Sequence, residues 1–306
     1  MRETLEQNYI SVILVISSEE DNFTEKIEKI NKILNNNFKN SEIIIVDNSV
    51  GRINLSNLSE QEIKHTLIKL PIKHGSQQAL NAGTAIAIGD YIIEIEDTSF
   101  NIEYNQIMDL YRKSQEGYDF VFLTPKKSRK SSKLFYKILN SYFKNMFNSD
   151  ISSSIMTLSS RRGQNKIAEV GKRVINRNVA YVLSGLKTFS IITDVEYKNK
   201  RSFSDNLMLM FDTLIYHIDA IMLISQRLSF IFLGLFSLGI TYSIILKLFF
   251  NIVEGWASLF ILLSLGFFGI FFILSIIIRY LHHILRSSLN SKDSIYRVVE
   301  KHSNNN

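Results

Sequence analysis

The sequence predicts an α/β protein with an open sheet, followed by a pair of long apolar helices. Three observations indicate this. Short β-branched segments alternate with amphipathic helical segments through the first two thirds of the chain, as in sheets covered by helices. Two of these strands end in acidic residues, where α/β sheets bind ligands. Near the C-terminus, two apolar runs are each long enough to cross a bilayer.

The composition limits the classes of function that the chain can have. Its 306 residues allow one large domain and an appendage. The absence of cysteine excludes disulfides, thiolate metal sites and a cysteine nucleophile. The net charge of +6 is compatible with nucleic acid, membrane headgroups or no anionic partner. Because the apolar runs favour the membrane, no nucleic-acid partner is expected.

The most informative stretch lies between residues 74 and 100. Small and apolar residues at helical spacing predict a helix over residues 77–88, and the β-branched run 91–95 predicts a buried strand after a Gly-Asp turn. This strand breaks at Glu96 and Asp97. Carboxylate oxygens past the end of a central strand suit Mg²⁺ or Mn²⁺ on a diphosphate. The alternative is an ordinary strand end with solvated acids.

A second strand repeats this pattern. Residues 42–46 predict a buried strand that ends at Asp47 and Asn48, although these two residues also suit the start of a turn. The first strand, residues 10–16, is followed by a loop that contains Glu19. Apolar spacing predicts the remaining elements of this region, namely helices at 23–34 and 104–115, an edge strand at 63–70 and a strand at 120–123.

A basic segment follows the strand at 120–123. It contains Lys126 and Arg129, and apolar and aromatic residues continue at helical spacing as far as Phe147. A charge run of this kind is commonly a solvated surface. A basic, aromatic amphipathic helix can also lie in a membrane interface, and the later apolar runs favour that interpretation. A serine-rich stretch then ends at Arg161 and Arg162.

The two apolar runs, residues 228–250 and 256–278, predict a membrane hairpin because the five-residue linker between them is too short for a domain. Lys247 is the only charge within them and lies near an end, where it can snorkel. Basic residues precede the first run and follow the second, which predicts that both ends are cytoplasmic. The alternative is a buried helical hairpin. The short first apolar run follows Glu3 and Glu6, so no signal peptide is expected.

The order of these parts resembles the inverting family-2 glycosyltransferases with a GT-A, Rossmann-like fold. It is most similar to the membrane-bound branch that transfers a sugar from a nucleotide to polyprenyl phosphate, the dolichyl-phosphate-mannose synthases and bactoprenol glucosyltransferases. In that family a glycine-containing helix, a Gly-Asp turn and a strand lead to an Asp-x-Asp metal site. The corresponding residues here are Glu96, Asp97 and Thr98.

The resemblance implies a role for each candidate residue. Glu96 and Asp97 would be the catalytic metal site for Mg²⁺ or Mn²⁺. The family's Asn-x-Gly before the central helix corresponds to Lys73, His74 and Gly75. The residues implied for nucleotide binding are Glu19, Asp47, Asn48 and Gly75, and those implied for the diphosphate and acceptor phosphate are Lys126, Arg129, Arg161 and Arg162.

The resemblance also implies the partners and the location. The donor would be a UDP- or GDP-linked sugar and the acceptor a polyprenyl phosphate, in polysaccharide or glycolipid assembly at the cytoplasmic face of the plasma membrane; a homo-oligomer is compatible with this. A catalytically silent membrane scaffold and an enzyme with a protein or glycan acceptor are the alternatives. The expected parts are a cytoplasmic GT-A domain over 1–204, a juxtamembrane amphipathic helix over 205–227, the transmembrane hairpin over 228–279 and a cytoplasmic tail over 280–306.

Overall fold

The computed structural model of the protein divides into two units, which are considered separately. The first comprises residues 1–206 and 292–306, and the second comprises residues 207–291. The structure describes residues 5–17, 23–49, 63–96, 103–126, 133, 136–137, 140–141, 151–170, 176–195, 213, 220–249, 255–289 and 297–302.

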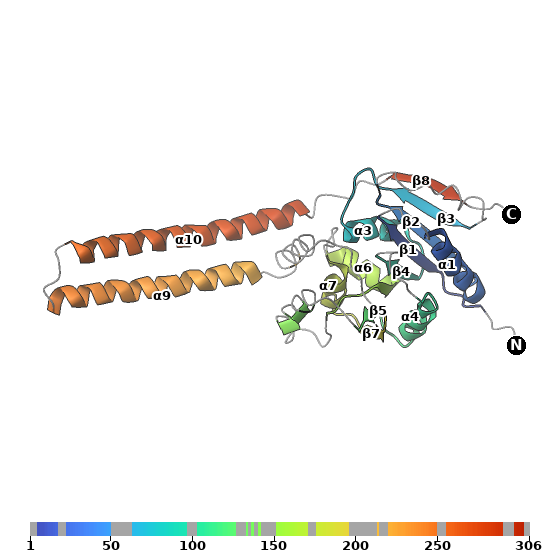
Figure 1. Ribbon diagram of the computed structural model, residues 1–306, viewed down its shortest axis with the longest axis horizontal. Helices are drawn as coiled ribbons and strands as arrows, with labels where there is room; N and C mark the ends of the chain where they lie inside the picture. Colours follow the sequence, from blue (N-terminus) through green and yellow to red (C-terminus); the bar gives the residue numbers. More distant parts are fainter. Residues whose placement is uncertain are drawn as a thin grey trace. The chain divides into compact units, whose positions relative to one another are not determined.

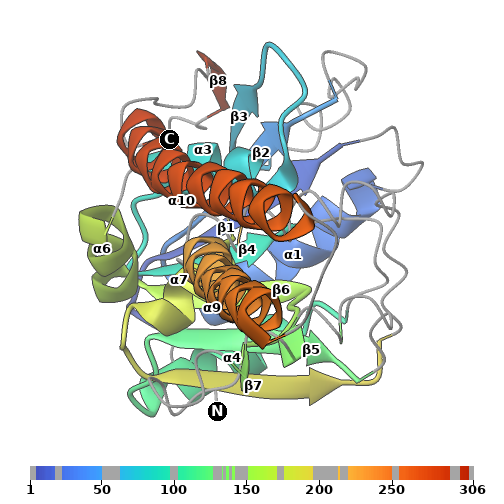
Figure 2. The same cartoon turned by 90° about the vertical axis from the view of Figure 1, so that its left-hand side faces the viewer.

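The first unit is built on a mixed sheet with the strand order β7-β5-β6-β4-β1-β2-β3-β8 (Figures 1 and 2). At its centre β1 (Ile10–Ile16) is parallel to both β2 (Ser41–Asp47) and β4 (Tyr91–Ile95). Next to β2, β3 (His65–Lys69) is also parallel. These four strands therefore end at one side of the sheet, which we call the carboxyl edge; the opposite side is the amino edge.

One strand of the sheet runs in the opposite direction. β6 (Met156–Ser160) is antiparallel to both of its neighbours, β4 and β5 (Phe120–Pro125). β7 (Thr188–Thr193) is parallel to β5 at one end of the sheet. Because Met156 is paired with Ile95, β6 begins at the carboxyl edge and ends at the amino edge.

The other end of the sheet is formed by the C-terminal part of the chain. β8 (Arg297–His302) is antiparallel to β3, as Figure 1 shows, so β3 has a neighbour on each side. The prediction that residues 63–70 form an edge strand was therefore wrong. The pairing joins segments more than 200 residues apart, and local residue patterns do not record such a partner.

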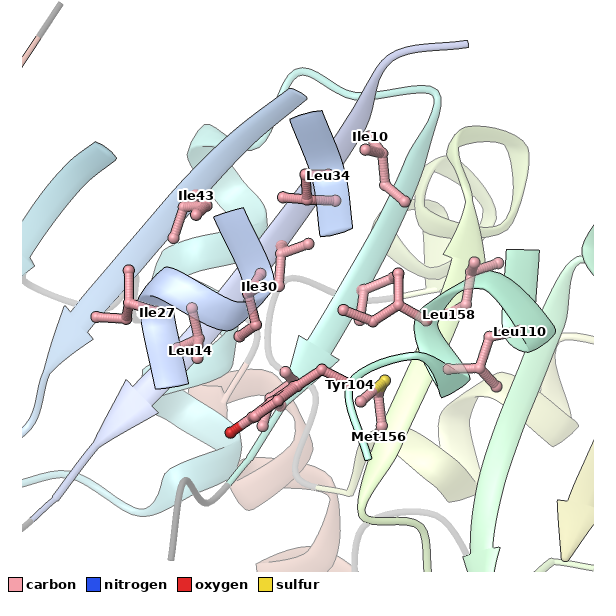
Figure 3. Packing of buried hydrophobic residues seen from close by; sticks show 14 of the residues in the cluster. Ile10, Leu14, Ile27, Ile30, Leu34, Ile43, Tyr104, Leu110, Met156 and Leu158 are labelled. Carbon is pink, nitrogen blue, oxygen red and sulfur yellow. The ribbon is translucent and has the colours of Figure 1, made fainter. Parts of the chain in front are cut away.

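Helices cover both faces of the sheet. α1 (Phe23–Asn37) and α4 (Gln106–Gln115) contribute to one hydrophobic core, and α3 (Ser76–Ile86) contributes to the other. β1 is buried along its whole length, which agrees with a sequence in which every residue except Ser11 is apolar. Figure 3 shows the first core, in which α1 directs its helically spaced residues Ile27, Ile30 and Leu34 towards the sheet.

Two short helices follow β6 in the chain. α6 (Arg161–Val170) begins directly at the end of β6, and α7 (Arg177–Leu183) precedes β7. The side chain of Asn176 caps α7 by accepting a hydrogen bond from the Val179 amide at 3.3 Å. These helices bring polar side chains to the face of the sheet that α3 also covers.

A buried ion pair lies on this face. Glu94 of β4 and Arg177 of α7 each have a side chain that is 3% exposed. The Arg177 Nε donates to Glu94 Oε2 at 2.8 Å, and its Nη2 donates to the other carboxylate oxygen. Glu94 Oε1 also accepts from the Tyr181 hydroxyl at 2.6 Å and from Gln164 Nε2 at 3.1 Å. The buried carboxylate is therefore fully paired, as a buried charge requires.

The environment of Arg177 favours its charged state. Burial by itself lowers the pKa of Arg177, but the neighbouring charge of Glu94 raises it above the ordinary value. Burial raises the pKa of Tyr181 well above its ordinary value, so its hydroxyl remains a donor. Arg177 also donates from its backbone N–H to Gln77 Oε1 at 2.9 Å and from Nη1 to Asn81 Oδ1, so it joins α7 to both β4 and α3.

The second unit consists of two long helices that pack along each other. α9 (Ala220–Phe249) and α10 (Trp256–Leu289) are antiparallel, as Figure 1 shows. The rings of Phe232 and Phe271 stack between them with centroids 4.9 Å apart. Within α10, residues Leu259–Ile278 are long and apolar enough to cross a membrane; in α9 the apolar stretch among the described residues, Phe230–Leu246, is shorter.

The predicted membrane-proximal elements are only partly described. Residues 220–227 of the predicted juxtamembrane helix are the first residues of α9, and most of the rest of that helix lies outside the described residues. Most of the basic, aromatic segment after Lys126 lies outside them as well.

Replacement of Gly83 tests how closely α3 packs on the sheet. A Cβ at this position would lie 2.5 Å from Ile13 Cγ2 and 3.2 Å from Val46 Cγ2. We expect Gly83→Ala to lower the free energy of unfolding by about 1–3 kcal/mol, despite the better helix propensity of alanine. Urea denaturation measures this change. Gly75→Ala, whose Cβ meets nothing within 4 Å, is the control and should change stability by less than about 0.5 kcal/mol.

The Glu94–Arg177 pair generates a second prediction. Arg177→Leu leaves a buried carboxylate without its cation and should lower the free energy of unfolding by about 3–5 kcal/mol. The double variant Glu94→Leu with Arg177→Leu removes both charges and should be about 2 kcal/mol more stable than the single variant, although the buried Tyr181 hydroxyl loses its carboxylate acceptor. Urea denaturation of the three proteins measures this coupling. A double variant no more stable than the single variant would contradict it.

Candidate active site

Three of the predicted residues gather at the carboxyl edge of the sheet. Asp47 is the last residue of β2 and is paired with Ile16, the last residue of β1. Glu96 follows the last residue of β4 directly, and Gly75 is the N-cap of α3. Parallel pairing of β1 with β2 and β4 brings these chain segments together, as expected for a ligand site in an α/β sheet.

Asp47 is buried, with 1% of its surface exposed. Its Oδ1 accepts hydrogen bonds from the Ser49 backbone N–H at 2.9 Å and from the Ser49 hydroxyl at 2.6 Å. Its Oδ2 is also buried and has no hydrogen-bond partner among the described residues. Because a buried carboxylate oxygen without a donor is costly, Oδ2 is a suitable position for a donor group of a ligand.

Asn48 organises the loop before α3. Its Nδ2 donates to the His74 carbonyl at 2.8 Å, and its Oδ1 accepts from the His74 backbone N–H at 2.8 Å. The predicted nucleotide ligand Asn48 thus directs its amide group towards this loop, which leads into Gly75. His74 Nδ1 lies 3.2 Å from Gln78 Oε1, while its buried Nε2 has no partner in the part of the chain that the structure describes.

The N-terminus of α3 lies beside Glu96. The Ser76 hydroxyl donates to Glu96 Oε1 at 2.5 Å, which fixes the carboxylate against the first turn of the helix. Gly75 leaves space at this point, because an added Cβ would meet nothing within 4 Å. The positive end of the helix dipole and an open backbone favour a bound anion near the N-terminus.

The predicted cationic residues fall into two groups. Lys126, directly after β5, is at the carboxyl edge, where its Nζ lies 3.1 Å from Asp194 in an exposed ion pair. Arg161 and Arg162 are instead the first residues of α6 at the amino edge. There Arg161 Nη2 donates to the carbonyls of Ala87 and Gly89 at 2.7 and 2.6 Å.

Arg162 has a protein partner at that edge too. Its Nε and Nη2 donate to the carboxylate of Asp119 at 2.9 and 2.5 Å, and this pairing raises the pKa of Arg162. The structure therefore does not bring Arg161 and Arg162 together with Asp47, and the prediction that they contact phosphate needs correction. The cause is the direction of β6, which carries its last residues away from the carboxyl edge.

Three predicted residues, Glu19, Asp97 and Arg129, lie outside the described residues. Within the described ranges, no group of three or more His, Asp or Glu side chains is placed to bind a metal ion. Glu96, with its hard carboxylate oxygens, is the described member of the predicted metal site. Oxygen ligands of this type suit Mg²⁺ or Mn²⁺.

Sequence reasoning missed several polar residues beside the site. The loop 151–155 lies at the carboxyl edge, because it leads into β6. Asn178 binds it twice, since its Nδ2 donates to the Ser152 carbonyl at 3.1 Å and its Oδ1 accepts from the Ser154 hydroxyl at 2.9 Å. Tyr136 also hydrogen-bonds to Asn178, and burial raises the pKa of this tyrosine to about 12. A signal for the nearby ion pair was present in the sequence, because Glu94 is a charge within an apolar strand.

Comparison with known proteins supports this description of the fold. The structure is similar to that of glucosyl-3-phosphoglycerate synthase from Mycobacterium tuberculosis in complex with Mn²⁺, UDP and glucosyl-3-phosphoglycerate, with a TM-score of 0.51, 16% identity, and 68% of this chain and 78% of that chain covered. For the complex of the same enzyme with Mn²⁺, UDP and phosphoglyceric acid, the values are 0.52, 15%, 68% and 76%. At this identity the similarity shows a common fold. No curated protein matches the sequence.

The sequence itself identifies the family. The family model for glycosyl transferase family 2 matches residues 11–178, which is more than half of the chain and includes the strand ends that carry Asp47 and Glu96. The mixed sheet, with β6 antiparallel between β4 and β5, agrees with the GT-A fold that the resemblance implied. The chain belongs to glycosyl transferase family 2.

Proposed function

We propose that the protein transfers a sugar, with inversion, from a nucleoside diphosphate to a polyprenyl phosphate at a membrane surface. The observation that carries the proposal is the buried Oδ2 of Asp47, which has no partner among the described residues, at the same edge as the open N-terminus of α3 and the carboxylate of Glu96. Within a family-2 glycosyltransferase, this arrangement provides an acceptor for a donor group of the nucleotide and a position for its phosphates.

On the donor side, Asp47 would accept a hydrogen bond from the base or the ribose of the nucleotide. Asn48 would act indirectly, because its amide holds the backbone of His74 and thereby the loop that leads to Gly75. Glu19, in the loop after β1, completes the proposed nucleotide-binding set. The Mycobacterium tuberculosis synthase was solved with UDP, which is consistent with a nucleotide ligand for the shared fold.

The residues present fit a divalent cation in their chemistry. Glu96 supplies carboxylate oxygens at the carboxyl edge, and Asp97 is the next residue. The cation, when bound, would neutralise the charge that develops on the departing diphosphate. Ser76 would orient Glu96 through its hydrogen bond, and Lys126 and Arg129 would attract the anionic groups of the two substrates.

The proposal of a phosphate acceptor depends on the chemistry of the side of the site that the loop 151–155 forms. Thr124 and Ser152 approach each other there, with their hydroxyl oxygens 3.2 Å apart, and Ser154 lies nearby. A hydroxyl acceptor requires a base to remove its proton. A phosphate acceptor is already ionised and requires positioning and charge neutralisation instead. Hydroxyl groups and cations therefore suit a phosphate acceptor.

The membrane part of the proposal is supported by the second unit. Large apolar side chains of α9 and α10 are exposed, such as Leu238, Leu248, Leu259 and Leu262. Residues Leu259–Ile278 are long enough to cross a bilayer. We propose that both helices insert as a hairpin, with both chain ends in the cytoplasm because of the basic residues that flank the apolar runs.

A second candidate function is a catalytically silent membrane scaffold. It is favoured by the replacement of both outer aspartates of the family's metal motif with Glu96 and Thr98. Binding of nucleotide and metal separates the two functions.

A transfer assay tests the proposed function. Purified protein in detergent is given undecaprenyl phosphate and a panel of UDP- and GDP-sugars with Mn²⁺, Mg²⁺ or EDTA. We expect transfer of one sugar that EDTA abolishes, and a loss of at least about a hundredfold in kcat in Asp97→Asn and Glu96→Gln. Glu169→Gln, an exposed acid of α6, is the control. Absence of transfer together with absence of UDP and GDP binding would favour the scaffold.

A binding measurement tests the role of Asp47 separately. In Asp47→Asn, Oδ1 can still accept from Ser49, but the group at the position of Oδ2 becomes a donor. We expect binding of the preferred nucleotide, UDP or GDP, to weaken about 10- to 100-fold. Calorimetric titration measures this change, and Asp109→Asn, an exposed acid of α4, is the matched control. Unchanged affinity in Asp47→Asn would exclude it from the nucleotide site.

A further inference from the structure

Two consecutive residues of α7 connect opposite sides of the candidate active site. Arg177 reaches Glu94 on β4 and Asn81 on α3, the helix whose N-terminus holds Glu96 through Ser76. Asn178 reaches the loop 151–155 at the carboxyl edge. The donor side of the site and the proposed acceptor side are therefore joined through one dipeptide.

Asn178 is bound to the loop by directional contacts. Its side-chain N–H group donates to the Ser152 carbonyl, and its side-chain oxygen accepts from Ser154. The two ends of the loop have other partners, because the Ile151 amide donates to Asn140 Oδ1 at 2.8 Å and the Ile155 amide donates to the Leu123 carbonyl at 2.9 Å. Within the loop, the Ser152 hydroxyl lies 3.2 Å from Thr124 Oγ1 and the Ser154 hydroxyl 2.9 Å from Thr157 Oγ1. Asn178 is the residue that binds both Ser152 and Ser154 and so joins the loop to α7.

The energetics of the buried pair argue against a role in stability alone. A buried ion pair recovers little more than the cost of removing its charges from water, and apolar residues in its place are often as stable. Apolar contacts, however, do not fix the relative orientation of the elements that they join. Arg177 holds β4, α3 and Gln164 of α6 at defined hydrogen-bond distances, so the pair determines how α7 is oriented on the sheet.

Another arginine of the protein, Arg162, can be compared with Arg177. Arg162 also forms a paired contact with a buried acid, Asp119, whose side chain is 5% exposed. That contact lies at the amino edge, and the side chain of Arg162 is 71% exposed. The two arginines thus share their chemistry and differ in whether their partners connect to the carboxyl edge.

We propose that Arg177 and Asn178 are positioning residues that hold the acceptor-side loop 151–155 in place relative to the donor side formed by β4 and α3. Neither residue is required to touch a substrate. The proposal rests on the proposed transfer reaction for its effect on activity, but its structural part, the restraint of residues 152–154 by α7, stands independently.

The test uses the full chain in detergent with three variants. Asn178→Ala removes the contacts to the loop, and Glu94→Leu with Arg177→Leu removes the polar link without leaving an unpaired charge. Arg162→Met is the matched control. Hydrogen–deuterium exchange of the Ile151 and Ile155 amides, which bracket residues 152–154, the KM for undecaprenyl phosphate, and the affinity for UDP and GDP are measured in each.

We expect Asn178→Ala to increase the exchange rate of the hydrogen-bonded Ile151 and Ile155 amides at least tenfold and to raise the KM for undecaprenyl phosphate at least tenfold, while nucleotide affinity stays within twofold. The double variant should show the same pattern even though it is more stable than Arg177→Leu, which a purely structural role would not produce. Arg162→Met should change none of these quantities.

Two results would overturn the proposal. One is an unchanged exchange rate of the Ile151 and Ile155 amides in Asn178→Ala, and the other is a loss of nucleotide affinity equal to the loss of acceptor binding. If the wild type transfers no sugar, the proposed function fails, and the exchange rates alone decide whether α7 restrains the loop.

Discussion

The hydrogen bonding of β1 between β2 and β4 is the constraint on which the rest of the first unit depends. Because all three strands are parallel, their ends must lie at the same edge of the sheet. This brings Asp47 and Glu96 together although they are 49 positions apart in the chain. Since the strands are buried on both faces, their ends are the positions where polar side chains can be presented at low cost.

Glu94 is an exception to the rule that polar side chains lie at the strand ends, because it places a charge within the buried strand β4. The strand tolerates it only because Arg177, Tyr181 and Gln164 supply donors to its carboxylate. These partners come from the half of the domain that follows the antiparallel strand β6. One buried carboxylate therefore orients the second half of the domain on the first, in addition to the hydrogen bonds between strands.

Local patterns in the sequence predicted β1, β2, β4 and β5 and the helices α1, α3 and α4, and the strand-then-acid pattern placed Asp47 and Glu96 at one edge. They did not predict β6 or α6. Local patterns did not predict the features that depend on contacts between segments far apart in the chain. The direction of β6, which removes Arg161 and Arg162 from that edge, follows from pairing with β4 and β5. The partner of Glu94 is 83 residues away, and the neighbour of β3 lies beyond both apolar helices. Apolar periodicity records burial, but it does not record which segment provides the contact.

The position of β8 has a consequence for biosynthesis. β3 leaves the ribosome roughly 230 residues before the strand that covers it, a delay of tens of seconds at ~5–20 residues per second. During this time the side of β3 that later pairs with β8 is an open strand edge, which favours association with other chains. The sheet becomes complete only after α9 and α10 have been synthesised. In every molecule, therefore, the apolar helices are synthesised first, and β8 pairs with β3 only afterwards.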